Sequence, residues 1–235
     1  HTMVFLKDSI FLNLVRGERE HENYGITHTM PYKLVDQAFS EELINNHSKE
    51  CRVCGSASLQ KVVSLGMSPL ANDFKESNEN EVQAPLQMDY CHECHNCQLS
   101  YVVPPALLFN NYLYVSSTSA SFRKHFQDAA EQYIKEFNLN KSTLVIDIGS
   151  NDGIFLKPLK ERGVEVLGIE PAKNIAEQAI KDGIPTINLY FDEFDEIDVQ
   201  EFRNNYGRAA LITASNVFAH SDNIHKIVTN VKEIL

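Results

Sequence analysis

Residues 144–153 read Leu-Val-Ile-Asp-Ile-Gly-Ser-Asn-Asp-Gly, and this stretch constrains the fold more than any other part of the chain. The apolar, β-branched run from Leu144 to Ile148 is typical of a strand that is buried on both faces of a parallel sheet. Gly149 and Gly153 let the backbone turn sharply and approach a ligand closely. Helical apolar spacing follows from Ile154 to Arg162, so the first free N–H groups of that helix would face the ligand. The stretch predicts the first strand, turn and helix of a nucleotide-binding α/β unit.

The turn has the pattern Asp147-x-Gly149-x-Asn151-x-Gly153. It resembles the acidic-x-Gly-x-Gly-x-Gly loop of S-adenosylmethionine-dependent methyltransferases, with Asn151 at the middle glycine, and asparagine tolerates a left-handed backbone. A dinucleotide is the alternative ligand. However, the turn lacks the Gly-x-Gly-x-x-Gly order, and Asp147 would repel a pyrophosphate. The same carboxylate suits the cationic methionine end of S-adenosylmethionine, so the pattern favours a methyl donor.

The segment Val164–Glu170 is the predicted second strand, and it ends in a carboxylate about 20 residues beyond the first glycine. Nucleotide-binding folds place the acid that binds the ribose hydroxyls at this position. Glu170 is therefore the predicted ribose ligand. Pro171 begins the next helix, and Asn174 lies one helical turn from the ribose acid. Both residues are included in the predicted cofactor site.

Two further strands are predicted at Ile184–Asn188 and Ala209–Thr213, with a helix over Glu196–Tyr206 between them. The carboxyl ends of the strands in an open α/β sheet carry the ligand-binding groups. Asn216 and His220 follow the last of these strands. They are predicted to contribute to the cofactor site and to acid/base chemistry or substrate binding, respectively. We expect about four strands of a sheet that usually has six or seven.

The composition excludes several classes of partner. The chain has 235 residues, with 21 basic and 32 acidic side chains and a net charge of −11. No basic cluster is present, which argues against nucleic acid but leaves a small phosphorylated ligand open. No apolar stretch reaches the ~18 residues of a membrane span, and no signal peptide is visible. We expect a soluble, cytoplasmic protein with no membrane partner, and nothing indicates its oligomeric state.

All five cysteines lie between residues 51 and 97. Cys51-x-x-Cys54 and Cys91-x-x-Cys94 form two knuckles, each able to present two thiolates to one tetrahedral Zn²⁺. In a cytoplasmic protein such clustering indicates a metal site rather than disulfides. Cys94 and Cys97 form a third possible pair, and His92 and His95 are further donors, but a structural zinc site takes only four ligands. Spacing alone leaves the choice among these seven residues open.

Residues 99–119 join the cysteine region to a helix predicted from about Ser121 to Phe137. A strand beginning at Leu99 should stop at Pro104 and Pro105. Tyr112 and Tyr114 occupy alternate positions of an extended segment, so their side chains should point the same way.

Residues 1–47 form an N-terminal extension, and the tail of a preceding domain is one interpretation of it. Within this extension, two short strands near Met3–Leu6 and Ile10–Val15 and a helix over Tyr32–Asn46 are predicted.

Seven segments in a fixed order resemble the bacterial deoxysugar C-methyltransferases, which carry a zinc-binding domain ahead of a methyltransferase domain. They are Cys-Arg-Val-Cys-Gly, Pro-Leu-Ala-Asn-Asp-Phe, Cys-His-Glu-Cys with the following Val-Val-Pro-Pro, Leu-Phe-Asn-Asn-Tyr-Leu-Tyr-Val-Ser-Ser-Thr-Ser, Asp-Ile-Gly-Ser-Asn-Asp-Gly, Gly-Ile-Glu-Pro and Ser-Asn-Val-Phe-Ala-His. The resemblance extends from about Cys51 to Leu235. It implies a small zinc-binding α+β domain at 48–120 and a partial, Rossmann-like class I methyltransferase domain at 121–235.

The resemblance also implies roles for individual residues. The distance from the second knuckle to the Pro-Pro pair selects Cys94 rather than Cys97, so the implied zinc ligands are Cys51, Cys54, Cys91 and Cys94. Gly149, Asp152 and Glu170 are implied to bind S-adenosylmethionine, as part of a predicted cofactor site that comprises Asp147, Gly149, Asn151, Asp152, Gly153, Glu170, Pro171, Asn174 and Asn216. His220 and a tyrosine of the Tyr112–Tyr114 segment are implied to face the sugar.

Members of this family act on a thymidine-diphosphate (TDP) keto-deoxysugar, removing the proton beside the ketone and methylating the resulting enolate. The family's Tyr-x-Glu-His segment, which supplies the favoured base, would lie beyond Leu235. We therefore expect that this chain binds zinc and cofactor but does not turn over by itself. Two alternatives are a non-catalytic zinc and nucleotide-fold scaffold and a methyltransferase of another substrate class.

Overall fold

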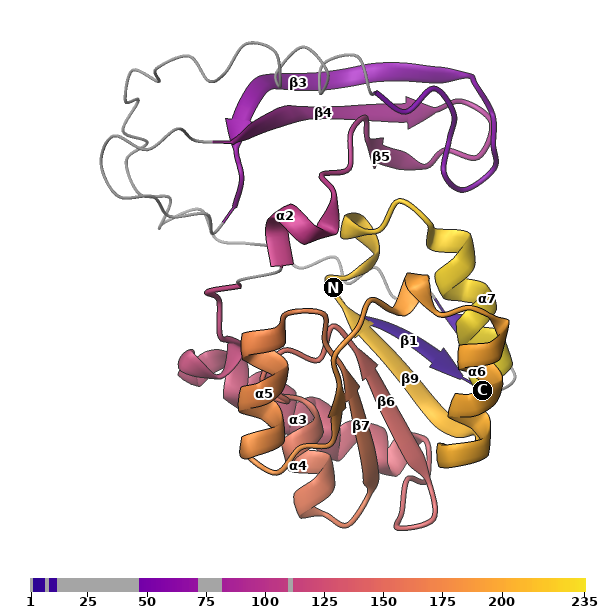
Figure 1. Cartoon of the computed structure of the whole chain (residues 1–235). Coiled ribbons are helices and arrows are strands. Elements are labelled where there is room, and N and C mark those ends of the chain that lie inside the picture. The colour runs from indigo at the N-terminus through magenta and orange to yellow at the C-terminus, as the bar shows by residue number, and fades with distance from the viewer. Residues whose placement is uncertain (1, 7–8, 12–46, 72–81, 110–111) are drawn as a thin grey trace.

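The structure is a computed structural model, and it describes residues 2–6, 9–11, 47–71, 82–109 and 112–235. It consists of a larger α/β unit and a smaller antiparallel sheet that lies across the carboxyl ends of the larger unit's parallel strands (Figure 1). The helix predicted over Tyr32–Asn46 and most of the N-terminal extension lie outside the described residues.

The larger sheet has the strand order β2-β1-β9-β6-β7-β8. Four of its strands come from the C-terminal half of the chain and pair in parallel: β6 (Leu144–Ile148), β7 (Glu165–Ile169), β8 (Thr186–Ile187) and β9 (Ala209–Ser215). All five residues of β6 are buried, as its continuous apolar run predicts. The glycine loop therefore leaves the sheet at its centre.

Two strands from the start of the chain extend this sheet beyond the four that were expected. β1 (Thr2–Leu6) pairs antiparallel with β9, and β2 (Ser9–Phe11) pairs antiparallel with β1. An unpaired edge of β9 would leave a row of N–H and C=O groups without partners. The N-terminal residues satisfy that edge, a pairing between positions more than 200 residues apart that local sequence patterns do not reveal.

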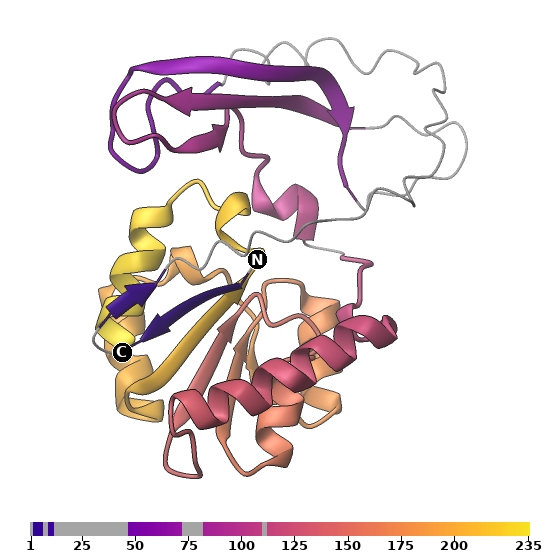
Figure 2. The same cartoon turned by 180° about the vertical axis from the view of Figure 1, so that it is seen from behind.

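Helices cover both faces of the larger sheet (Figures 1 and 2). On one face, α3 (Ala120–Glu136), α4 (Leu156–Glu161) and α5 (Lys173–Lys181) bury apolar side chains against Val145, Val166 and Leu211. On the other face, α6 (Glu196–Tyr206) and α7 (Ile224–Ile234) pack against Ile146, Leu167 and Ile212. Alternate residues of each strand thus contribute to two separate apolar cores.

The smaller sheet has the order β3-β4-β5, with strands β3 (Leu59–Pro69), β4 (Gln83–Cys91) and β5 (Cys97–Leu99). The strand predicted from Leu99 to the Pro-Pro pair is wrong in its bounds, because β5 ends where that strand was expected to begin. Tyr101 instead packs beside Leu70 and Ala84 in a small apolar cluster. The short helix α2 (Pro105–Phe109) follows at once.

Within the described part of the chain, the helices are all too short or too polar to cross a membrane.

Candidate functional site

The two knuckles bring four sulfur atoms together at the end of the smaller sheet. The Sγ atoms of Cys51, Cys54, Cys91 and Cys94 all lie within 4.8 Å of one another. The second knuckle begins where β4 ends at Cys91, and each knuckle closes a turn in which a later backbone N–H donates to the carbonyl of its first cysteine. These turns aim both thiols of a knuckle in the same direction.

The thiols interact strongly enough to perturb one another. Burial raises the pKa of the Cys51 thiol, but hydrogen bonds from the backbone N–H groups of Cys54 and Val53 outweigh it and lower this pKa to about 6. The backbone N–H of Asn96 lowers the pKa of Cys94, yet burial and the neighbouring thiols raise it to about 12. Four thiolates at these distances therefore need a cation to hold them ionised. A tetrahedral Zn²⁺ is the ion that prefers four sulfur ligands, so the residues present fit it.

The other candidate donors lie outside the group of four sulfurs. Cys97 is exposed and begins β5. His92 and His95 are also exposed; the Nε2 of His92 lies 2.9 Å from Gln60 Oε1, and Nδ1 of His95 contacts the Tyr90 hydroxyl. The structure thus brings together the four cysteines that the resemblance implied.

The glycine loop connects β6 to α4 beneath a cavity of about 370 Å³. Gly149, Asn151 and Gly153 all have a positive φ, between +50° and +78°. A Cβ atom on Gly149 would lie 2.7 Å from the Val217 side chain, and one on Gly153 would lie 2.9 Å from Ile184. Glycine at both positions lets the loop pack closely against neighbouring segments. Asn151 adopts the left-handed backbone that its place in the pattern required.

Glu170 follows β7 and is buried beside the loop. Its Oε2 accepts a hydrogen bond from the backbone N–H of Asn151 at 2.8 Å, and its Oε1 accepts one from Ala172 at 2.9 Å. Burial raises the pKa of Glu170, although these two hydrogen bonds oppose the shift. Both oxygens keep a lone pair each, so the carboxylate can still accept hydrogen bonds from the hydroxyls of a ribose.

A second buried carboxylate, Asp147, lies in β6 below the cavity. Burial and, to a smaller extent, repulsion from Glu170 raise the pKa of Asp147, and they outweigh the hydrogen bond that Oδ1 accepts from the Thr213 hydroxyl at 2.7 Å, so the pKa is about 7. Two carboxylates in one desolvated cavity favour a ligand that brings hydroxyl groups and positive charge. Ser150, which also lines the cavity, has a buried hydroxyl with no hydrogen-bond partner among the described residues. These features fit S-adenosylmethionine.

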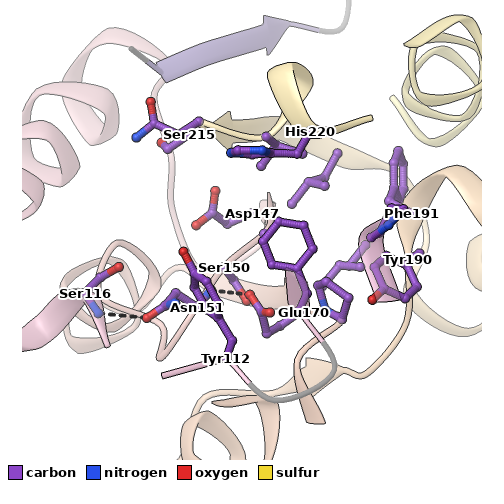
Figure 3. Close-up of a pocket in the computed structure, with 18 of the residues that line it drawn as sticks. Tyr112, Ser116, Asp147, Ser150, Asn151, Glu170, Tyr190, Phe191, Ser215 and His220 are labelled. Atoms are coloured by element: carbon purple, nitrogen blue, oxygen red, sulfur yellow. Dashed lines mark hydrogen bonds between the residues drawn. The ribbon is translucent and has the colours of Figure 1, made fainter. Parts of the chain in front are cut away.

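Nine of the twelve predicted catalytic and cofactor residues line this single cavity (Figure 3). They are Tyr112, Tyr114, Asp147, Gly149, Asn151, Glu170, Pro171, Asn216 and His220.

Three predicted cofactor residues do not line the cavity, and each has another contact. Asp152 Oδ2 accepts from the backbone N–H of Ser117, and Asn174 Nδ2 donates to the Tyr112 carbonyl. Gly153 packs against Ile184. Their assignment to the cofactor site stays a prediction.

His220 lies in the 3₁₀ helix η3 (Phe218–His220) after β9, and it lines the same cavity as the two tyrosines. Its ring meets Phe109 of α2 at a centroid distance of 5.6 Å, and Phe109 meets Tyr112 at 5.4 Å. Desolvation by these walls lowers the pKa of His220, so the imidazole is neutral near pH 7. A neutral imidazole can accept a proton or a hydrogen bond from a bound substrate.

The sequence did not predict the remaining walls of the cavity. Tyr190 and Asp192 line it from the region of η2 (Phe191–Glu193), which follows the two-residue strand β8. Ser221 donates to Asp192 Oδ2 at 2.7 Å and joins this region to the end of η3. Tyr190 and Asp192 could have been identified from their place just beyond the end of the predicted strand Ile184–Asn188, where ligand-binding groups lie in such sheets.

The described residues include contacts between the first knuckle and the α/β unit. Arg52, between the first two cysteines, donates from Nε to Asp222 Oδ1 at 2.6 Å, and Nε2 of His225 lies 3.0 Å from the Val53 carbonyl. Asp222 immediately follows Ser221, and His225 lies in the first turn of α7. The first knuckle thus contacts the segment that follows His220.

Comparisons with known proteins agree with this arrangement. Residues 51–109 match the family described as "Putative zinc binding domain", and residues 122–235 match the family described as "Methyltransferase domain". The chain is 32% identical over 189 residues to C-methyltransferase NovU of Streptomyces niveus, an alignment that covers 79% of this chain and 44% of the relative. The chain therefore spans less than half the length of that relative.

Among solved structures, an S-adenosylmethionine-dependent methyltransferase from Archaeoglobus fulgidus aligns with a TM-score of 0.26 and 24% identity, covering 30% of this chain and 31% of that one. Magnesium protoporphyrin IX methyltransferase from Synechocystis PCC 6803 aligns with a TM-score of 0.29 and 16% identity, covering 31% and 39%. The family assignment comes from the sequence matches, with the Cys₄ cluster and the glycine loop at the matched positions. The chain belongs to the class I S-adenosylmethionine-dependent methyltransferases in which a zinc-binding domain precedes the methyltransferase domain.

Proposed function

We propose that this chain is the zinc-binding and cofactor-binding part of a C-methyltransferase that acts on a nucleotide-linked keto-deoxysugar. One observation carries the proposal: the predicted ribose ligand, Glu170, and the predicted substrate-facing residues, Tyr112, Tyr114 and His220, line the same cavity. A methyl donor and an acceptor must meet in one water-poor space for transfer to occur. The 32% identity to a C-methyltransferase supports transfer to carbon.

When it is bound, S-adenosylmethionine supplies an electrophilic methyl group. In this chain, Glu170 would bind its ribose hydroxyls, and Asp147 would face its positive charge. The four cysteines would hold Zn²⁺ as a structural ion, because four protein ligands leave no position open for substrate.

The protein residues on the other side of the cavity would handle the sugar. A carbon beside a ketone loses its proton only if a base accepts the proton and a donor stabilises the oxyanion. His220, held neutral by its lowered pKa, would bind the sugar or move the proton at its imidazole, and the phenol of Tyr112 or Tyr114 would donate to the substrate oxygen. The nearby aromatic side chain of Phe109 would limit the access of water.

The cytoplasmic location expected from the sequence belongs to the same proposal. Free thiols that lie at metal-binding distances are typical of a reducing compartment.

Titration calorimetry with S-adenosylmethionine tests the cofactor half of the proposal. Glu170→Gln removes the charge but keeps one acceptor oxygen, and it should weaken binding by about 10- to 100-fold, as expected for two charge-assisted hydrogen bonds to ribose. Glu165→Gln makes the same change at the exposed start of β7 and should leave binding unaltered. Absence of binding by the unsubstituted protein, also in the longest available form of the chain, would instead favour a scaffold.

The substrate half is tested with the full-length protein and a labelled methyl donor. Transfer of label to the carbon skeleton of a TDP-linked keto-deoxysugar is the expected result. Transfer to peptides or RNA with no transfer to any nucleotide sugar would refute this choice of substrate.

A further inference from the structure

The main chain of residues 112–117, which we call the tyrosine segment, is held by side chains of the cofactor half of the site. Asn151, the middle residue of the glycine loop, makes two of these contacts. Its Oδ1 accepts a hydrogen bond from the backbone N–H of Ser116 at 2.8 Å, and its Nδ2 donates to the Tyr114 carbonyl at 3.1 Å. Figure 3 shows the first of these bonds between the labelled residues. One amide side chain therefore pairs with the main chain as a neighbouring strand would.

Two more side chains extend the same row of contacts. Asp152 Oδ2 accepts from the backbone N–H of Ser117 at 3.2 Å, and Asn174 Nδ2 donates to the Tyr112 carbonyl at 2.7 Å. All four hydrogen bonds run from the glycine loop or α5 to main-chain atoms. The tyrosine segment contributes no strand of its own here, so these side chains supply the partners that a sheet would otherwise provide.

The side chain of Asn151 has no counterpart in a loop with glycine at this place. Its backbone, with φ of +50°, is one that glycine adopts freely, so the turn itself does not need an asparagine. The residue is only 8% exposed, and both ends of its amide are paired with the tyrosine segment. One donor and one acceptor of the side chain are thus used in a contact with the protein's own main chain.

The same residue also contacts the predicted ribose ligand through its main chain. The backbone N–H of Asn151 donates to Glu170 Oε2 at 2.8 Å. Asn151 therefore links Glu170 to the Tyr114 carbonyl through two hydrogen bonds, one from its backbone and one from its side chain. The ring of Tyr112 lies 6.3 Å from the ring of Tyr114 and is connected through Phe109 to His220.

We infer that Asn151 is a positioning residue that ties the tyrosine segment to the cofactor loop, so that sugar binding and cofactor binding are coupled. The inference rests on the proposed function for the identity of the two ligands, cofactor and sugar. The hydrogen bonds between Asn151 and the tyrosine segment do not depend on that function. Because coupling between two sites is reciprocal, bound cofactor should tighten binding of the nucleotide sugar, and bound nucleotide sugar should tighten cofactor binding by the same factor. Cofactor bound at Glu170 should also slow exchange of the tyrosine segment's amides.

The variant Asn151→Gly tests the tie, since it keeps the backbone conformation and deletes only the side chain. Asn138→Gly is the matched control, because Asn138 has φ of +53° and lies in the connection after α3, away from the cavity. Hydrogen exchange followed by mass spectrometry or NMR should show the amide of Ser116 exchanging about fivefold faster or more in Asn151→Gly, a factor that corresponds to about 1 kcal/mol. In Asn138→Gly this amide should exchange at the unsubstituted rate.

One binding measurement and one exchange measurement separate positioning from direct ligand contact. In Asn151→Gly, the increase in S-adenosylmethionine affinity that a TDP-sugar produces in the unsubstituted protein should be lost. Asn151→Asp keeps the acceptor for Ser116 and loses the donor to Tyr114, so it should restore slow exchange at Ser116.

Unchanged exchange at Ser116 in Asn151→Gly, or an equal increase in Asn138→Gly, would overturn the inference. Loss of cofactor binding in Asn151→Gly without any change in exchange would assign Asn151 to the cofactor instead. Failure of the unsubstituted protein to bind cofactor would contradict the proposed function. The exchange rates at Ser116 would still test whether Asn151 holds the tyrosine segment.

Discussion

The zinc-binding cluster and the cavity above the glycine loop are built in opposite ways. All four cysteines come from two knuckles of four residues each, and one β-hairpin brings the knuckles together. The cavity takes its walls from the glycine loop, the ends of three other strands, the tyrosine segment and α2. A metal ion has a small coordination sphere that a short motif can fill, whereas a cavity for two organic ligands requires many distant segments. A single substitution should therefore abolish metal binding by the whole cysteine cluster, whereas a single substitution in the cavity should affect only part of its function.

The largest expected effect is the loss of zinc. Among the residues that the structure describes, the apolar cluster of the smaller sheet has three buried members, so metal binding should supply most of the stability of this sheet. Structural zinc contributes roughly 10–16 kcal/mol in comparable small sites. Cys91→Ser, at a fully buried ligand, should therefore abolish zinc binding and make residues 47–71 and 82–109 sensitive to protease. The core of the larger sheet is separate and should stay folded.

Cys97→Ser is the control, because it removes a cysteine that lies outside the cluster. Zinc content by atomic absorption should remain at one ion per chain in this variant. Equal zinc loss in both variants would show that the ligand set is wrong. Unfolding of the larger sheet in Cys91→Ser would show that the two regions are not independent.

The same contrast explains which parts of the site the sequence could predict. The knuckles and the glycine loop are local patterns, and Glu170 follows from its distance to the first glycine, so each could be located before any tertiary information. The contact between Ser221 and Asp192 joins residues 29 positions apart, and the pairing of β1 with β9 joins opposite ends of the chain. Such contacts depend on how segments pack, and no local pattern encodes them.

Asn151 shows a subtler limit of sequence reasoning. Its place in the loop correctly predicted a left-handed backbone at the cavity. Where its side chain points depends on the tyrosine segment, which approaches from a part of the chain more than 30 residues earlier. Asp152 and Asn174 follow the same pattern, because their side chains also bond to that segment. Motif position predicts the backbone of a loop better than it predicts the partners of its side chains.

A pH-dependent effect of intermediate size is expected at Asp147, in the floor of the cavity. Burial raises its pKa to about 7 in the folded protein, from 3.8 when it is exposed. Between these pH values the folded state binds the proton and the unfolded state does not, so this group makes folding less favourable as pH rises from about 4 to about 7. Asp147→Asn should remove the effect. The variant's gain in unfolding free energy should grow across this range, by about 4 kcal/mol at most.

Urea unfolding of both proteins between pH 4 and pH 8 measures that difference. Asp182→Asn, at an exposed carboxylate after α5, controls for the loss of a negative charge elsewhere. A gain for Asp147→Asn that stays constant over the whole range would mean that the carboxylate is not desolvated in the folded protein. The pH dependence of unfolding at Asp147 therefore measures the effect of burial on a carboxylate, whereas the four thiolates depend on a bound metal ion.

The smallest expected effect is at the contact between the two regions. Arg52 is nearly buried, with 10% of its side chain exposed, but its partner Asp222 is 75% exposed. Ion pairs with one partner in water contribute about 0.2–1 kcal/mol, so a double-mutant cycle with Arg52→Ala and Asp222→Ala should give a coupling energy in that range. The pair of Arg203 and Glu233, at 3.8 Å between α6 and α7, provides a comparison within the larger unit. A coupling energy above about 2 kcal/mol between Arg52 and Asp222 would mean that the knuckle and the segment after His220 fold as one unit. Loss of zinc in Cys91→Ser would then also disturb the segment after His220, which includes the cavity-lining Ser221.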